Sequence, residues 1–375
     1  MQTTKSLYEL FETITDIRSV HGRRYKLADL LALCTLAILN GCDGYRGISR
    51  YFQNHKTVLC QALGLEVVPS YDTVKNFLNS VDMLAVQKIF ITWMQQYVES
   101  GSGDWYAIDG KAMAGTIVDS QGKQQNFVSL VRLVQHNSGL IVGSHSYENG
   151  KSGETEAARQ LLNNCAAQME GNVLTADSLH CNSKTLAKIM DINVDYVVQL
   201  KGNCAALKKK ALEVTTQGLP DDTYIFPTEK AHGREENCEV ALYRNVSDLP
   251  PRWSKFVKGF IVLTCWGINN KKKPYAFKRY FVTNRITASA KELGKGIKGH
   301  WSVETVHYIK DVIMLEDQKI VHEKNAAVVL SILGDIAINL YKMNGHKSIK
   351  AARECYQNRV EEQLELMKLG HLLKN

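Results

Sequence analysis

The chain has 375 residues, of which 45% are apolar and 22% charged, and its net charge is +8. This length predicts about two domains, and the composition is that of a globular protein with a core of ordinary size. The chain does not begin with a basic segment followed by an apolar run, and no uninterrupted apolar stretch reaches the roughly 18 residues of a membrane span. We therefore expect a cytoplasmic protein without a membrane partner.

The nine cysteines are scattered, and no two of them have the C-x-x-C spacing of a zinc or redox site. This pattern predicts reduced thiols in a cytosolic protein.

The positive charge is concentrated in one segment. Residues 251–300 hold twelve Lys or Arg and one acid, Glu292, a net charge of +11. Such a concentration favours a polyanion as partner, nucleic acid above all. The alternative is a solvated surface with a lysine-rich turn at Lys271 to Lys273.

Residues 1–100 have the apolar spacing of helices and predict an all-α N-terminal domain. Ser70, after Pro69, is expected to cap the third helix. Short helices with such an entry fit a helix-turn-helix that binds DNA ends, and they fit a small helical packing domain equally well. The four expected helices cover residues 27–39, 45–62, 71–81 and 84–98.

Gly101-Ser102-Gly103 is a composition break, after which strands and helices alternate over residues 104–375. The order β-β-β-α-β-α-β predicts an α/β fold with a ribonuclease-H-like mixed sheet. A β-rich insertion is expected at about 220–285, and helices resume after it. The expected strands of the core cover residues 105–108, 127–134, 140–144, 172–176 and 196–200.

Three acidic residues occupy the elements that such a sheet brings together. Asp109 ends the first strand, Asp177 ends the fourth, and Glu304 lies in a late helix. Converging carboxylates repel one another, so such a site is unfavourable unless cations occupy it. Mg²⁺ prefers oxygen ligands, and two such ions about 4 Å apart promote in-line displacement at phosphorus. Each acid alone has a simpler explanation, because an Asp at a strand end commonly caps a turn and a lone helical Glu is commonly solvated.

Further polar and aromatic residues near these acids are candidates for DNA contacts. A Lys after the fifth strand can neutralise a phosphate, and the glycine beside it lets the backbone approach closely. The residues just before Glu304 are expected to lie near the same site. For most of them an ordinary loop is the alternative, and for Trp301 it is core packing. The candidates are Lys201, Asn203, His232, Arg234, Lys298, His300 and Trp301.

Several short stretches together resemble one family. They are Ala107-Ile108-Asp109-Gly110-Lys111, Ala176-Asp177-Ser178-Leu179-His180, Leu200-Lys201-Gly202-Asn203, His232-Gly233-Arg234, and His300-Trp301-Ser302-Val303-Glu304 with the later Glu316-Asp317. With them the sequence resembles the insertion-sequence transposases of the H-repeat-associated type, found with Rhs elements in bacteria. The resemblance covers nearly the whole chain. It implies a DDE catalytic core with a β-rich insertion before the final Glu.

The resemblance also implies a function. Asp109, Asp177 and Glu304 would be the catalytic metal ligands, with Mg²⁺ as cofactor and Mn²⁺ as a substitute. The substrate would be double-stranded DNA at the terminal inverted repeats, cut and joined by a homodimer on the bacterial nucleoid. Two alternatives stay open: a catalytically impaired DNA-binding relative, and a plain metal-dependent nuclease.

Overall fold

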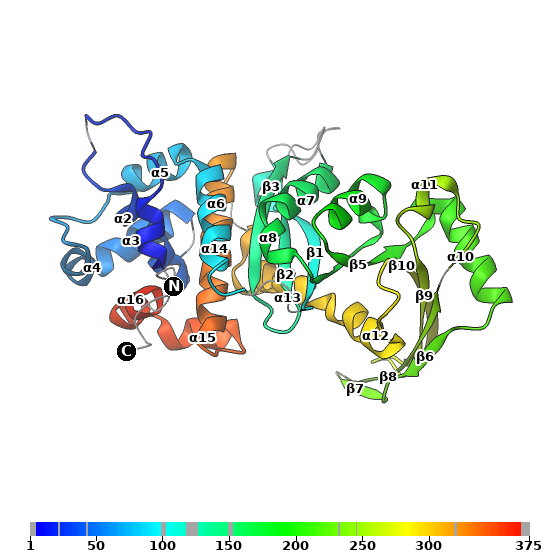
Figure 1. Cartoon of the computed structure of the whole chain (residues 1–375). Helices are drawn as coiled ribbons and strands as arrows, with labels where there is room; N and C mark the ends of the chain where they lie inside the picture. The colour runs from blue at the N-terminus through cyan, green and yellow to red at the C-terminus, as the bar shows by residue number, and fades with distance from the viewer. Residues whose placement is uncertain are drawn as a thin grey trace.

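The computed structural model describes residues 5–21, 23–42, 44–98, 103–117, 127–148, 153–231, 233–244, 246–318 and 321–368. Helices gather at one end of the molecule, and a long twisted sheet extends from them to the other end (Figure 1). The sheet has ten strands in the order β3-β2-β1-β4-β5-β10-β9-β8-β6, with β7 paired to β8. The chain therefore has the mixed α/β architecture that the sequence predicts.

The first five strands form the ribonuclease-H-like part of the sheet. β1 pairs antiparallel with β2 and parallel with β4, and β4 pairs parallel with β5. This arrangement makes the first and fourth strands neighbours, as expected. The five strands are β1 (Trp105–Ala112), β2 (Val128–Gln135), β3 (Ile141–Glu148), β4 (Val173–Ala176) and β5 (Asp195–Leu200).

β1 is longer than the sequence predicts. Its pairing with β2 continues past Asp109, as far as Ala112 opposite Ser129. Asp109 thus lies inside a strand, where the ladder holds its backbone, instead of at a strand end.

The β-rich insertion continues the same sheet. β10 pairs antiparallel with β5, and β9, β8 and β6 follow outward. A second apolar cluster fills the face of these strands that α12 (Ala290–Gly299) covers. The insertion strands are β6 (Asp222–Ile225), β7 (Glu229–Ala231), β8 (Arg234–Arg244), β9 (Gly259–Ile268) and β10 (Pro274–Thr283).

The expectation that all nine cysteines are reduced is wrong for two cysteines of this cluster. Cys238 on β8 is directly opposite Cys265 on β9, and the two form a disulfide. Spacing in sequence gave no sign of the pair, because the two residues are 27 positions apart and meet only through strand register.

The N-terminal helices pack together with the C-terminal ones. Ser70 accepts a hydrogen bond from the backbone of Thr73 and caps α5, as predicted. The helix expected over 45–62 is instead two helices that separate at His55. The helices of this end are α1 (Leu7–Glu12), α2 (Leu27–Leu39), α3 (Gly44–Asn54), α4 (Lys56–Leu63), α5 (Tyr71–Ser80), α6 (Met83–Met94), α14 (Lys324–Met343), α15 (Ile349–Tyr356) and α16 (Val360–Lys368).

α14 lies at the centre of this packing and contacts α2, α5 and α6 on one side and β2 and β3 on the other. One continuous apolar core therefore includes residues of both the helical end and the sheet. Part of the expected boundary, Gly101-Ser102, lies outside the described residues. The division into domains at 1–100 and 104–375 stays a prediction.

By length and composition α14 could cross a membrane, with a mean hydropathy of 1.5 over its most apolar window. However, 83% of that window is buried inside the protein, and the core helix of a folded domain passes the same test.

Candidate active site

An open cavity of about 370 Å³ lies where β1, β4, β5 and β10 meet α12 and α13 (Trp301–Tyr308). Asp109, Asp177 and Glu304 all line it. The three acids that the sequence singled out therefore face one space. The remaining lining residues are Thr175, Ala176, Val197, Gln199, Lys201, Arg279, Phe281, Ile297, His300 and Trp301.

Strand register brings the two aspartates together. Ile108 is the parallel partner of Ala176, so the next residues along the two strands, Asp109 and Asp177, are neighbours. The Oδ1 atom of Asp177 accepts a hydrogen bond of 2.8 Å from the backbone of Leu179 and caps a short 3₁₀ turn. Asp177 thus caps a turn, as the simpler explanation of an Asp at a strand end expected, and it also lines the cavity.

The charge around Asp109 is uncompensated. Burial, reinforced by the negative charges of Glu154 and Asp177, raises the pKa of Asp109 from 3.8 to about 7. A carboxyl whose ionised form is disfavoured in this way gains most from a nearby cation.

Glu154, at the start of α7 (Gly153–Asn164), is an acid that the sequence gave no reason to select. It lies so close to Gly110 that a Cβ there would come within 2.3 Å of its Cδ atom, so residue 110 must be glycine in this arrangement. Its carboxylate accepts a hydrogen bond from Tyr147 and lies 3.3 Å from Nε2 of His180. Although burial raises the pKa of Glu154, these two partners outweigh it and hold the pKa below its ordinary value.

Glu304 is exposed on α13, the helix that packs over β1 and β2. One turn later, Nδ1 of His307 lies 3.7 Å from Oδ2 of Asp109. Burial, together with the charges of Arg132 and Lys111, lowers the pKa of His307 to about 3, so the imidazole is neutral. α13 therefore contributes both an exposed acid to the cavity and a neutral contact to Asp109.

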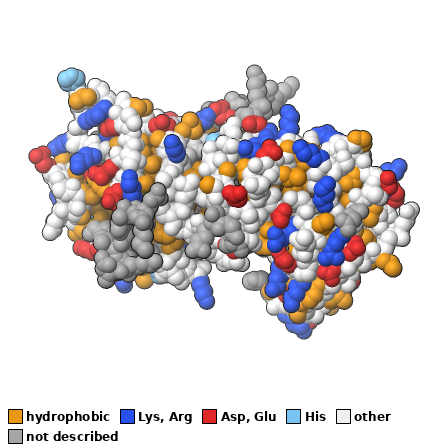
Figure 2. Space-filling model, viewed as in Figure 1, with side chains coloured by type: hydrophobic (Ala, Val, Ile, Leu, Met, Phe, Trp, Pro, Cys, Tyr) orange, Lys and Arg blue, Asp and Glu red, His pale blue; other side chains and the backbone are white. Residues whose placement is uncertain are grey.

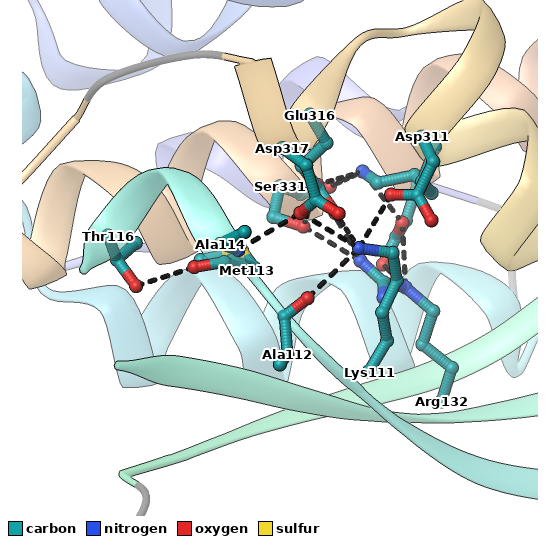
Figure 3. Close-up of polar contacts among 12 residues, drawn as sticks. Lys111, Ala112, Met113, Ala114, Thr116, Arg132, Asp311, Glu316, Asp317 and Ser331 are labelled. Atoms are coloured by element: carbon teal, nitrogen blue, oxygen red, sulfur yellow. Dashed lines mark hydrogen bonds and ion pairs between the residues drawn. The ribbon is translucent and has the colours of Figure 1, made fainter. Parts of the chain in front are cut away.

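A partly buried network of charges holds α13 and the π-helical turn after it (Ile309–Ile313) against the sheet. Nζ of Lys111 lies 2.6 Å from Asp311 and 3.1 Å from Asp317 (Figure 3). Lys111 is two residues after Asp109 on the same face of β1, and Asp311 lies in the π-helical turn that directly follows the helix of Glu304. This ion pair therefore fixes how the helix of Glu304 sits over the strand of Asp109.

The network continues away from the cavity. Arg132, opposite Asp109 in the β1–β2 ladder, is fully buried and binds Asp335 of α14 with Nε 3.0 Å from Oδ2. Nζ of Lys310 lies 2.9 Å from Glu316 and 3.2 Å from Asp335. Glu316 is buried, yet the charges of Lys310 and Arg132 outweigh burial and lower its pKa.

His300 is a half-buried wall of the cavity. Its Nδ1 lies 2.9 Å from Oγ1 of Thr175 on β4, and Nε2 of His136 lies 3.0 Å from the same oxygen. Burial lowers the pKa of His300 to about 4 and that of His136 to about 3. Both imidazoles are thus neutral near pH 7, and His300, at the junction of α12 and α13, ties these helices to β4.

The other predicted DNA contacts fall in different places. Lys201 lines the cavity, and Trp301 is 57% exposed there, so it is not a core residue. Asn203 donates a 2.6 Å hydrogen bond to the carbonyl of Ser178. Lys298 forms an ion pair with Glu229, and Arg234 one with Glu236, both away from the cavity wall. His232 lies outside the described residues.

The basic segment is more balanced in space than in sequence. Among the described residues, acids pair with two of its cations, Asp195 with Arg285 and Glu229 with Lys298. Figure 2 accordingly shows Lys and Arg side chains interspersed with Asp and Glu over the insertion end of the molecule.

The comparison with known families decides the identification. The model of the transposase DDE domain matches residues 103–340, and a DDE_Tnp_1-associated model matches residues 8–94. The chain belongs to the DDE transposase family. Members of this family generally use divalent metal ions, and a cavity lined by three carboxylates offers the hard oxygen donors that such ions require.

Two bacterial sequence relatives agree with this family. The chain is 29% identical to the putative transposase YncI of Escherichia coli O157:H7, over 90% of this chain and 87% of the relative. It is 27% identical to the H repeat-associated putative transposase YhhI of Escherichia coli K12, over 90% of both chains. Among solved structures, a piggyBac transposase synaptic complex with hairpin DNA aligns with 98% of this chain and 82% of its own, at a TM-score of 0.45 and 10% identity.

The raised pKa of Asp109 predicts a pH dependence for any metal ion that this carboxylate would bind. The folded pKa of about 7 lies above the ordinary 3.8, so in the metal-free protein this carboxyl stabilises the fold at low pH and loses that contribution as pH rises through 7. Because a cation binds the ionised form, the apparent Mg²⁺ affinity should rise about tenfold per pH unit up to pH ~7 and then level off.

Calorimetric titration of Mg²⁺ at several pH values measures this dependence. Asp109→Asn is the control, since it removes the titrating group and should flatten the profile. An affinity of the wild type that is already constant between pH ~5.5 and ~7 would contradict the expected coupling.

Proposed function

We propose that this transposase is a DNA endonuclease and strand transferase, with Asp109, Asp177 and Glu304 as its catalytic metal ligands. The observation that carries the proposal is the single cavity that these three carboxylates share. Two Mg²⁺ ions bound there would stabilise the attacking and the leaving oxygen of an in-line displacement at phosphorus.

The chain's own residues supply the positioning. The β1–β4 ladder holds the two aspartates side by side, and the Lys111–Asp311 pair sets the helix of Glu304 over them. Lys201, on the cavity wall, is suited to a phosphate oxygen, and Trp301 is suited to contact a nucleotide. His300, neutral and tied to Thr175, supports this wall.

The proposal extends to the substrate and the assembly. Residues 1–100 would bind the terminal inverted repeats of the element, and residues 104–375 would cut and join them. Two ends must be brought together, so a homodimer on nucleoid DNA in the bacterial cytoplasm is the working unit.

The test uses duplexes copied from the DNA on either side of the gene, carrying its inverted repeats. In Mg²⁺ or Mn²⁺ the protein should nick them at the repeat ends and join the released 3′-hydroxyls to a second duplex, and chelation with EDTA should stop both reactions. Joined products on a gel separate this activity from the alternatives. Nicking without joining would indicate a plain nuclease, and binding without nicking a catalytically impaired relative.

A further inference from the structure

Two cationic side chains, Lys201 and Arg279, lie beside the acidic cavity, where the pairing of strands β5 and β10 ends. The last pair of the β5–β10 ladder is Leu200 with Tyr280. The next residues outward are Lys201 and Arg279, and both line the cavity. Neither makes an ion pair with any residue that the structure describes. Two unneutralised cations at adjacent ladder positions repel each other and attract an anion between them.

The guanidinium of Arg279 is held in place by an aromatic row. It lies 4.8 Å from the centroid of the Phe277 ring, and Phe277 stacks on Tyr275 with ring centroids 6.1 Å apart and planes 14° from parallel. The hydroxyl of Tyr275 donates a 2.6 Å hydrogen bond to Glu236 of β8, two strands away, and this bond anchors the far end of the row. A guanidinium oriented on an aromatic face keeps its N–H donors free for a bidentate contact.

We propose that Arg279, together with Lys201, forms a phosphate-binding site at the rim of the catalytic cavity. This inference rests on the proposed function. The DNA strand would place one phosphodiester at the three acids, and the site would bind a neighbouring backbone phosphate of the same strand. The two side chains indicate the size and geometry of the ligand. The planar guanidinium of Arg279 and the compact ammonium group of Lys201 suit a phosphodiester, which offers two unesterified oxygens. Phe277 is then a positioning residue, because it acts through the orientation of Arg279.

The neighbouring Lys278 provides a matched control. It is an exposed cation on the same strand, and alternation along β10 places its side chain on the opposite face of the sheet, away from the cavity. Removing Lys278 therefore takes one positive charge from the same region without touching the proposed site.

The experiment measures the Kd of the full-length protein for a flank-derived duplex and for a scrambled duplex of the same composition, in EDTA, at several salt concentrations. Arg279→Ala should weaken binding of both duplexes about tenfold or more and lower the salt dependence by about one phosphate contact. Arg279→Lys should recover only part of the loss, since it keeps the charge but not the fork. Phe277→Leu should weaken binding while leaving the salt dependence nearly unchanged.

Each outcome decides the matter. Equal affinities and equal salt slopes for Arg279→Ala and Lys278→Ala would overturn the phosphate site while leaving the transposase assignment intact. A wild type that binds neither duplex would overturn both. Circular dichroism and thermal unfolding of each variant check that the sheet is preserved.

Discussion

Replacing Asp109 with asparagine is expected to lower metal-dependent DNA cleavage by at least about 10³-fold and to leave DNA binding unchanged. The substitution keeps the size of the side chain and the β1 ladder but removes a negative charge and an anionic oxygen donor from the cavity. Bound metal ions contribute several kcal/mol to stabilising the transition state, and about 4 kcal/mol corresponds to 10³ in rate.

Glu304→Gln should have an effect of the same size, and a comparison with Glu154→Gln tests the choice of the third acid. Glu304 is exposed in the cavity, whereas the carboxylate of Glu154 already has Tyr147 and His180 as partners. Glu154→Gln should therefore lose only about tenfold or somewhat more, as expected for a residue that supports a metal ligand.

Cleavage and strand-transfer rates on radiolabelled duplexes measure both effects, and a gel-shift assay confirms binding. Asp191→Asn, an exposed acid at the end of α9 (Ser183–Asp191), is the control and should cut at the wild-type rate. Full activity of Glu304→Gln with loss of activity in Glu154→Gln would move the third ligand to α7.

The second large effect concerns stability. Asp335→Asn should lower the free energy of unfolding by about 3–5 kcal/mol, because it leaves the buried Arg132 without its main partner and the buried Lys310 with Glu316 as its remaining acidic partner. Asp335 is fully buried and also accepts a 2.7 Å hydrogen bond from Ser144, so water cannot replace the lost charge.

Urea unfolding followed by circular dichroism measures this loss. Glu362→Gln breaks the Arg359–Glu362 pair at the start of α16, whose two side chains are more than half exposed, and should change stability by no more than about 0.5 kcal/mol. Equal midpoints for the two variants would show that the buried network contributes no more than a surface ion pair.

The sequence predicted the strand order well because each core strand is a compact apolar run between polar turns. The convergence of Asp109 and Asp177 followed from that order alone. The end of β1 was misjudged because Gly110, Lys111 and Ala112 lack the apolar character of the preceding residues, although they are held in the ladder by β2.

The residues that the sequence missed share a physical reason. Glu154 and Arg132 acquire their importance from His180 and Asp335, partners far away in the chain that no local spacing reveals. Arg279 alternates with Phe277 and Phe281 along β10, a period-2 signal that was present.

The pairing of β10 with β5 limits where the β-rich insertion can be shortened. β5 would be the last strand of the core, and β10 covers an edge that would otherwise present unpaired N–H and C=O groups. Shortening the insertion at its outer strands, β6 and β7, leaves that edge protected, whereas removing β10 uncovers it beside the cavity. Length changes are therefore tolerable at the tip of the sheet and costly at its junction with the core.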